Sequence, residues 1–231
     1  MKKEVFRANS RGENKLDWLN SKFSFSFGDY YNPKRMGFGA LRVINDDIIT
    51  PNGGFPPHQH KDMEIITIVT SGELEHQDNL GNIESLTAGD VQTMSAGSGI
   101  IHSEFNKSSN HELKLFQIWI ETKKVGINPS HSKKHFDYKE NKITLVASGI
   151  KKGALPINQD ASVYFGKIFK EKELTYEPSN LNGAFLMVIE GELEVEGEEI
   201  GARDAIQITN ATKINIKGIE NTEFILIEVP V

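Results

Sequence analysis

The sequence predicts an all-β protein made of two tandem β-barrels with little helix. Short stretches of alternating apolar and polar residues recur along the 231 residues, and turn residues such as those at 88–90 (Ala-Gly-Asp) separate them. Frequent short strands are typical of sandwiches and barrels. The second half repeats this pattern, because residues 190–194 (Glu-Gly-Glu-Leu-Glu) resemble residues 71–75 (Ser-Gly-Glu-Leu-Glu). Self-similarity at this size favours two related barrels, residues 1–130 and 131–231, over a solenoid.

Individual strands are expected wherever the side chains alternate with period two. In the first half the pattern predicts strands at 23–27, 38–44, 48–50, 64–70, 73–78, 83–86, 91–94 and 113–120, with a tight turn at 45–47. In the second half it predicts strands at 143–148, 163–169, 185–195 (interrupted at 190–191), 205–209 and 224–229. Residues 129–138 are expected to be a connecting loop, and only residues 14–20 and 170–174 have weak helical character.

Composition excludes several classes of protein. The chain has no cysteine, which rules out disulfides, thiolate metal sites and cysteine nucleophiles. Its formal net charge of −6 argues against a nucleic-acid surface, which requires a basic face. Charged and polar residues occupy the N-terminus where a signal peptide would be apolar, and no apolar run is long enough to span a membrane. We therefore expect a cytoplasmic protein with no direct nucleic-acid or membrane partner.

Two pairs of residues with metal-ligand chemistry lie within fifty residues of each other. Side chains alternate faces along a strand, so His58 and His60 point the same way, and so do His102 and Glu104. One such histidine pair alone is more commonly a core or half-exposed feature than a ligand pair. Two pairs, each beside glycines and an apolar strand, indicate a metal site.

The identity of the carboxylate ligand stays open at this point. Glu64 and Asp62 share the parity of His60 if the strand continues without interruption. Glu104 is the stronger candidate, because only Ser103 separates it from His102 and little room remains for a bulge. Three histidines and one carboxylate with vacant positions suit Fe(II) oxygen chemistry, although the ligand types also suit Cu, Ni and Zn. No histidine follows His135, so only the first barrel is expected to bind metal.

These residues carry a family resemblance. The stretch from Gly54 through His58, His60 and Glu64, followed by residues 89–106, resembles the two motifs of the cupin superfamily, small β-barrels that hold a metal in the barrel mouth. Residues 36–47, 54–64, 75–78 and 94–104 resemble more closely the pirins, which have two such barrels. Ser95 departs from the cupin pattern, which has proline there.

The pirin resemblance implies an activity and a ligand set. The metal ligands would be His58, His60, His102 and Glu104, with Glu64 as a supporting carboxylate. One divalent ion is implied, usually Fe(II), with Cu, Ni, Mn, Co and Zn as alternatives. The implied reaction is oxygen-dependent cleavage of flavonols such as quercetin with release of carbon monoxide. Glu104 would be the catalytic base, and Glu64 is the alternative.

Two other functions compete with this one. Some pirins act as regulatory partners of transcription factors or enzymes, which would need the same four ligands and a protein partner instead of a flavonol and O2. A sugar-phosphate isomerase is disfavoured, because Lys61 is the only cationic residue close in sequence to the histidines.

Overall fold

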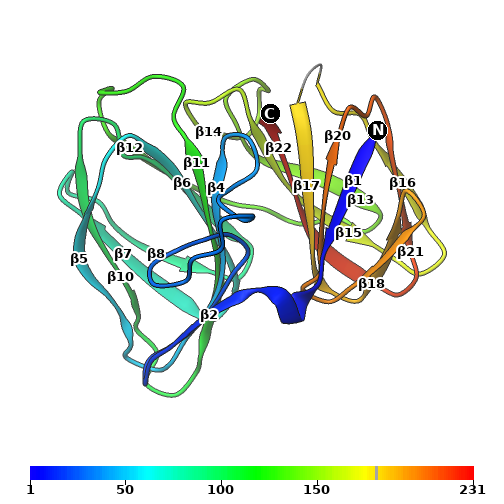
Figure 1. The fold of residues 1–231 in the computed structure, drawn as a ribbon. Coiled ribbons are helices and arrows are strands. Elements are labelled where there is room, and N and C mark those ends of the chain that lie inside the picture. Colours follow the sequence, from blue (N-terminus) through cyan, green and yellow to red (C-terminus); the bar gives the residue numbers. More distant parts are fainter. Residues whose placement is uncertain (180–181) are drawn as a thin grey trace.

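The chain folds into two β-barrels that lie side by side, as expected (Figure 1). This computed structural model describes residues 1–179 and 182–231. Each barrel consists of one seven-stranded and one four-stranded sheet. The only helix in the described ranges is a single 3-10 turn at Ala8–Ser10, so the all-β prediction is confirmed. Within those ranges, no helix has the length and hydropathy needed to cross a membrane.

The first barrel contains eleven strands. Its larger sheet has the order β12-β9-β6-β11-β4-β3-β2, and its smaller sheet has the order β5-β10-β7-β8. The strands are β2 (Gly12–Lys15), β3 (Leu19–Phe23), β4 (Leu41–Ile49), β5 (Gly54–His60), β6 (Met63–Ser71), β7 (Glu73–Asp78), β8 (Ile83–Thr87), β9 (Asp90–Ser95), β10 (Ile100–Asn106), β11 (Leu113–Glu121) and β12 (Ser130–His135).

The second barrel repeats this arrangement. Its larger sheet has the order β1-β20-β17-β22-β15-β13-β14, and its smaller sheet has the order β16-β21-β18-β19. The strands are β1 (Lys2–Phe6), β13 (Lys142–Ser148), β14 (Leu155–Pro156), β15 (Ser162–Ile168), β16 (Glu173–Tyr176), β17 (Asn182–Glu190), β18 (Glu192–Val195), β19 (Glu198–Gly201), β20 (Ala205–Thr209), β21 (Ile214–Gly218) and β22 (Thr222–Pro230). The matched segments 71–75 and 190–194 form the same turn, with Gly72 at φ 82° and Gly191 at φ 84°.

Two segments cross the boundary expected between residues 130 and 131. Strand β1 pairs with β20 of the second barrel, so the N-terminus is part of the larger sheet there, as Figure 1 shows. Strand β12 pairs with β9 of the first barrel over Ser130–His135, where a connecting loop was expected. Sequence periodicity does not report such pairings, because the partner strands are about forty or more residues away along the chain.

Strand β4 corrects the expected hairpin. Asn45, Asp46 and Asp47 were predicted to turn the chain, but β4 runs unbroken from Leu41 to Ile49. Asp46 accepts a hydrogen bond from Arg11 and forms an ion pair with Arg203, and both contacts anchor the strand. The expected strand at 23–27 was also wrong, because β3 ends at Phe23, and the weakly helical residues 14–20 and 170–174 form strand ends and turns.

The central strands of the larger sheets are buried on both faces. On β11, Phe116, Ile118 and Ile120 join a large apolar cluster that also contains residues of β15, β17 and β22, so the two larger sheets pack against each other. The intervening residues Leu115 and Gln117 face the interior of the first barrel. This interior carries only small apolar clusters, and a cavity lined by both polar and apolar side chains occupies the rest.

Candidate metal centre

Three histidines from the smaller sheet of the first barrel converge. Strands β5 and β10 pair antiparallel with His58 opposite His102, and His60 lies two residues along on the same face. The ring centroids are 4.5 to 4.9 Å apart, and one nitrogen from each ring lies within 4.8 Å of the others. His58 Nδ1–H donates to the Pro56 carbonyl at 2.8 Å, which leaves Nε2 free to act as a ligand.

Glu104 lies deeper in the barrel, on the same face as His102. The pairing of β10 with β5 shifts between His102 and Glu104, but β10 itself stays regular against β7. A Glu104 carboxylate oxygen lies within 4.8 Å of a nitrogen of His102 and of His76, in a second grouping that does not include His58 or His60. Glu104 therefore lies next to the three histidines and is grouped with His102, not with His58 or His60.

Three side-chain donors hold the Glu104 carboxylate. Gln92 Nε2 donates to Oε1 at 2.9 Å, Gln117 Nε2 donates to Oε2 at 2.6 Å, and Thr67 Oγ1 lies 3.4 Å from Oε1. An ionised carboxylate has about four lone-pair sites, so one remains available. Burial raises the pKa of Glu104 to about 7, with a further contribution from the charge of Asp47. A nearby cation would favour the ionised form.

His60 and His102 are neutral near pH 7. Burial, together with the neighbouring histidines, lowers the pKa of His60 to about 4 and that of His102 to about 2. Neutral imidazole is the form that binds a metal. The buried His102 Nε2 has no hydrogen-bond partner among the described residues.

A cavity of about 290 Å³ opens over these side chains. His58, His60, His102 and Glu104 form one part of its wall. Another part is apolar and aromatic, and it consists of Leu19, Phe23, Phe27, Phe55 and Trp119. The Trp119 ring stands edge-on to His60 at 4.9 Å and to Phe27 at 5.3 Å. The cavity therefore combines metal-ligand chemistry with a surface suited to a flat aromatic molecule.

Asp47 is a cavity residue that the sequence analysis assigned to a turn. It lies on β4, is only 2% exposed, and accepts a hydrogen bond from Ser21. Burial raises its pKa to about 7. The signal in the sequence was the period-two series Leu41, Val43, Asn45, Asp47 and Ile49, whose members are all buried.

The polar groups that hold Glu104 were also missed. Gln92 on β9 and Gln117 on β11 are buried polar residues, and the sheet pairing brings them together through Thr67. The orientation of the Gln92 amide is fixed by His131, whose Nε2–H donates to Gln92 Oε1 at 3.1 Å. His131 lies on β12, in the segment expected to be a loop.

The alternative carboxylates lie outside this cluster. The chain turns at Asp62, which has φ 50°, so β5 ends at His60 and β6 begins at Met63. Glu64 therefore does not inherit the parity of His60. It faces the second barrel, where Oε2 accepts hydrogen bonds from Ser95 Oγ at 2.5 Å and from the Asn158 amide at 2.9 Å. Asp62 Oδ1 accepts a hydrogen bond from the Gly126 amide at 2.6 Å.

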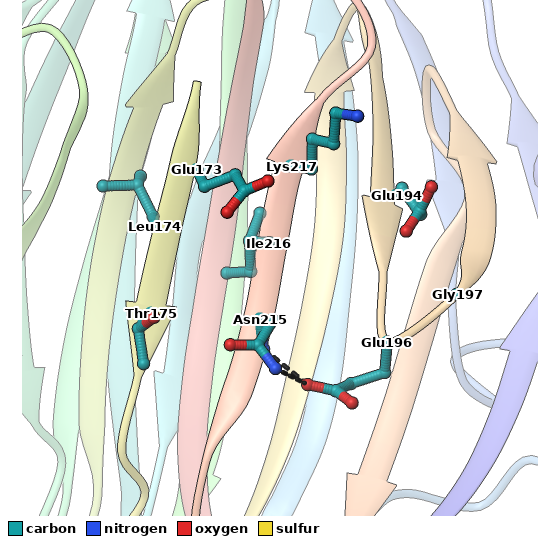
Figure 2. A pocket seen from close by; sticks show the side chains of 9 residues that line it. All are labelled: Glu173, Leu174, Thr175, Glu194, Glu196, Gly197, Asn215, Ile216 and Lys217. Carbon is teal, nitrogen blue, oxygen red and sulfur yellow. Dashed lines mark hydrogen bonds between the residues drawn. The ribbon is translucent and has the colours of Figure 1, made fainter. Parts of the chain in front are cut away.

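A groove on the second barrel has a different character. It has a volume of about 260 Å³ and lies across β16, β18 and β21 of the smaller sheet (Figure 2). Glu196 accepts hydrogen bonds from the Asn215 amide and side chain there, and Glu173, Glu194 and Lys217 are spread over the strands. None of the residues lining this groove is a histidine. The alternating glutamates form a strand surface, since Leu193 and Val195 between them are buried.

Comparison with known families decides what kind of protein has this fold and site. The family model described as pirin matches residues 5–120, and the one described as quercetinase C-terminal cupin domain matches residues 145–229. The chain belongs to the pirin family. It is 39% identical to a quercetin 2,3-dioxygenase of Escherichia coli K12 over 224 residues, which cover 97% of each chain. It is 45% identical to a pirin-like protein of Caulobacter vibrioides over 215 residues, covering 91% of this pirin and 92% of the relative.

Solved structures agree with this assignment. The crystal structure of YhhW from Escherichia coli superposes with a TM-score of 0.96 at 39% identity, covering 100% of this pirin and 99% of YhhW. The structure of bacterial pirin YhhW in complex with nickel(II) superposes with a TM-score of 0.94 at 38% identity, covering 99% of each chain. The expected two-barrel pirin fold is therefore confirmed.

Proposed function

We propose that this pirin is a metal-dependent dioxygenase that cleaves flavonols such as quercetin, and that His58, His60, His102 and Glu104 hold one divalent ion. The observation that carries the proposal is the convergence of three histidines and a buried glutamate at an aromatic-walled cavity. The names of full-length relatives at about the same identity support the reaction class. The ligand types favour Fe(II) and also suit nickel, the ion bound to YhhW.

The residues fit a metal because His58, His102 and Glu104 each offer an otherwise unused lone pair. His102 Nε2 is buried and has no partner within residues 1–179 and 182–231, and a buried polar atom left unpaired costs about 1 to 3 kcal/mol. His58 Nε2 is free because its Nδ1–H is donated to Pro56. Glu104 has one lone pair beyond its three donors. A bound cation would satisfy all three atoms.

A bound divalent ion would supply Lewis-acid polarisation of the flavonol oxygens. The overall reaction consumes one O2 and releases one CO. Ionising a flavonol hydroxyl requires an acceptor for its proton, and the Glu104 carboxylate has the proximity and a pKa near 7 that suit a general base. The single free lone pair means that Glu104 serves as ligand or as proton acceptor, not as both at once. Asp47 on the opposite wall is a second acceptor within the cavity.

The aromatic wall would orient the substrate. Phe27, Phe55 and Trp119 offer ring faces and edges to a planar molecule, and they exclude water from the side of the cavity facing the histidines. Exclusion of water protects an ionised flavonol from reprotonation and strengthens the electrostatic effect of the site.

Metal content and quercetin loss under air test the proposal together. Purification without chelator is expected to give bound metal and metal-dependent loss of the quercetin absorbance band. The His58→Ala, His60→Ala double variant is expected to lose both, while His111→Ala, which removes an exposed histidine of the same barrel, keeps both. Bound metal without quercetin loss in the wild type would contradict the dioxygenase and favour the regulatory partner, for which a pull-down is the next experiment.

A further inference from the structure

Beyond the four proposed ligands, a buried pair of side chains stands behind His102. His76 and Asp78 lie on β7, which pairs with β10 so that Asp78 is opposite His102 and His76 is opposite Glu104. Both side chains are fully buried. His76 Nδ1 lies 3.4 Å from His102 Nδ1, and His76 Nε2 lies 3.2 Å from Asp78 Oδ2. The three residues form a continuous chain of contacts that ends at the metal centre.

The Asp78 end of the chain is a hydrogen-bond acceptor. Oδ1 accepts from the Leu80 and Asn82 amides at 2.9 and 3.1 Å, and Oδ2 accepts from Asn82 Nδ2 at 2.8 Å. Burial alone would raise the pKa of Asp78, but the hydrogen bonds from Asn82, His76 and Leu80 leave the pKa below its ordinary value. An ionised carboxylate has no proton to give. His76 Nε2 must therefore carry the proton that lies between the two residues.

That proton determines the next contact. His76 is fully buried and its Nδ1 faces a ring nitrogen, not a carboxylate, so a single N–H, on Nε2, satisfies both of its contacts. With the proton on Nε2, His76 Nδ1 is an acceptor, so His102 Nδ1–H donates to it. A neutral His102 protonated at Nδ1 has its lone pair at Nε2, and this is the buried atom that has no partner among the described residues.

We propose that Asp78 and His76 are positioning residues that fix the tautomer of His102 and so present its Nε2 lone pair to the metal. The proposal rests on the proposed metal site and adds two residues to it. His76 is not itself a ligand in this arrangement, although it lies within 4.8 Å of His102 and Glu104, because both of its ring nitrogens are already used. Outer hydrogen bonds of this kind orient metal-bound histidines in many sites.

The substitution Asp78→Asn is expected to reverse the chain of hydrogen bonds. Asparagine retains an oxygen for the Leu80 and Asn82 amides, but its NH2 group would face His76 Nε2 and donate to it. His76 would then be protonated at Nδ1 and donate to His102 Nδ1, which moves the His102 proton to Nε2, the metal-binding atom. Glu84→Gln is the matched control. Glu84 lies on β8 opposite His76, and the substitution removes one negative charge as Asp78→Asn does, but the Glu84 carboxylate pairs with Lys133 and not with the His76 ring.

Two measurements on the full chain test this. In metal-free protein, long-range ¹H–¹⁵N spectra distinguish protonated from unprotonated ring nitrogens, and we expect His102 to carry its proton on Nδ1 in the wild type and in Glu84→Gln, and on Nε2 in Asp78→Asn. In chelator competition with nickel(II) as the probe, we expect the dissociation constant of Asp78→Asn to rise about 10- to 100-fold over the control.

Wild-type His102 protonated at Nε2 would overturn the proposal without any variant. So would an Asp78→Asn protein that folds and binds nickel(II) within about twofold of the control. The tautomer measurement uses no metal and no substrate, so it tests the positioning role even if the wild type binds no nickel(II). Failure of the wild type to bind nickel(II) would instead contradict the proposed metal site.

Discussion

The two barrels share one architecture and differ in what fills them. When residues 71–75 are matched to 190–194, the strand pairings of the two barrels correspond position by position. The polar residues of the first barrel then have apolar or aromatic counterparts in the second. The pairs are His58 and Tyr176, Thr67 and Leu186, His76 and Val195, Gln92 and Ile206, His102 and Ile214, Glu104 and Ile216, and Gln117 and Leu226.

This difference shows what the metal site requires of the fold. The counterparts in the second barrel all belong to one continuous apolar core, whereas the first barrel has two small clusters with the cavity between them. The second barrel is also closed at the position of His58, because Tyr176 donates a hydrogen bond to the buried Glu228. The interior of the second barrel is a packed apolar core, whereas the interior of the first barrel has less apolar packing and holds polar groups around a cavity.

The largest expected effect is a loss of stability when a glutamate equivalent to Glu104 is placed in the interior of the second barrel. Ile216→Glu puts a glutamate at the position matching Glu104, where the three donors are replaced by Leu186, Ile206 and Leu226. A buried charge without partners is expected to lower the free energy of unfolding by about 3 to 5 kcal/mol. Urea denaturation followed by circular dichroism measures this, with Ile216→Val as the control. A loss no greater than that of Ile216→Val would show that the second interior is not a packed core.

Next in size is the loss of the carboxylate from the first barrel. Glu104→Gln keeps the shape but turns an NH2 group toward Gln92 or Gln117, which are themselves donors. We expect turnover of quercetin to fall about 100-fold, in the range for loss of a general base, together with reduced metal content. Glu75→Gln on the outer surface of the same sheet serves as the control. Full turnover with full metal content in Glu104→Gln would remove Glu104 from the mechanism.

The smallest effect is a pH dependence that only the first barrel should show. Asp47 has an ordinary pKa of 3.8 that burial raises to about 7 in the folded protein. Between these values the folded state keeps a proton that the unfolded state releases, so metal-free protein loses stability as pH rises through this window, by up to about 1.4 kcal/mol per pH unit for one group. Urea denaturation at pH 5 to 8 should give a shallower decline for Asp47→Asn. Identical declines would mean that Asp47 does not carry this proton.

The sequence predicted the fold class and the histidines proposed as ligands, because both predictions depend on the local alternation of side chains along a strand. His58 with His60, and His102 with Glu104, are neighbours along a strand, and alternation alone places each pair on one face. Their convergence also required β5 to pair with β10 in a register that no local pattern encodes. Glu64 illustrates the limit, since one turn at Asp62 separates its face from that of His60.

The polar surroundings of the site could not be predicted in the same way. Gln92, Gln117 and His131 are far apart in sequence and meet only through strand pairing. Asp47 was assigned to a turn because Asn-Asp-Asp is typical of turns in general, while here its flanking apolar residues keep it in a strand. Long-range pairing turned these isolated polar residues into parts of one site.

The central claim is that only the first barrel binds a metal, and anomalous scattering from crystals of metal-loaded protein tests it most directly. The account predicts one anomalous peak per chain, bonded to His58, His60, His102 and Glu104, and no peak inside the second barrel. A peak elsewhere, or none at the three histidines of fully loaded protein, would contradict it.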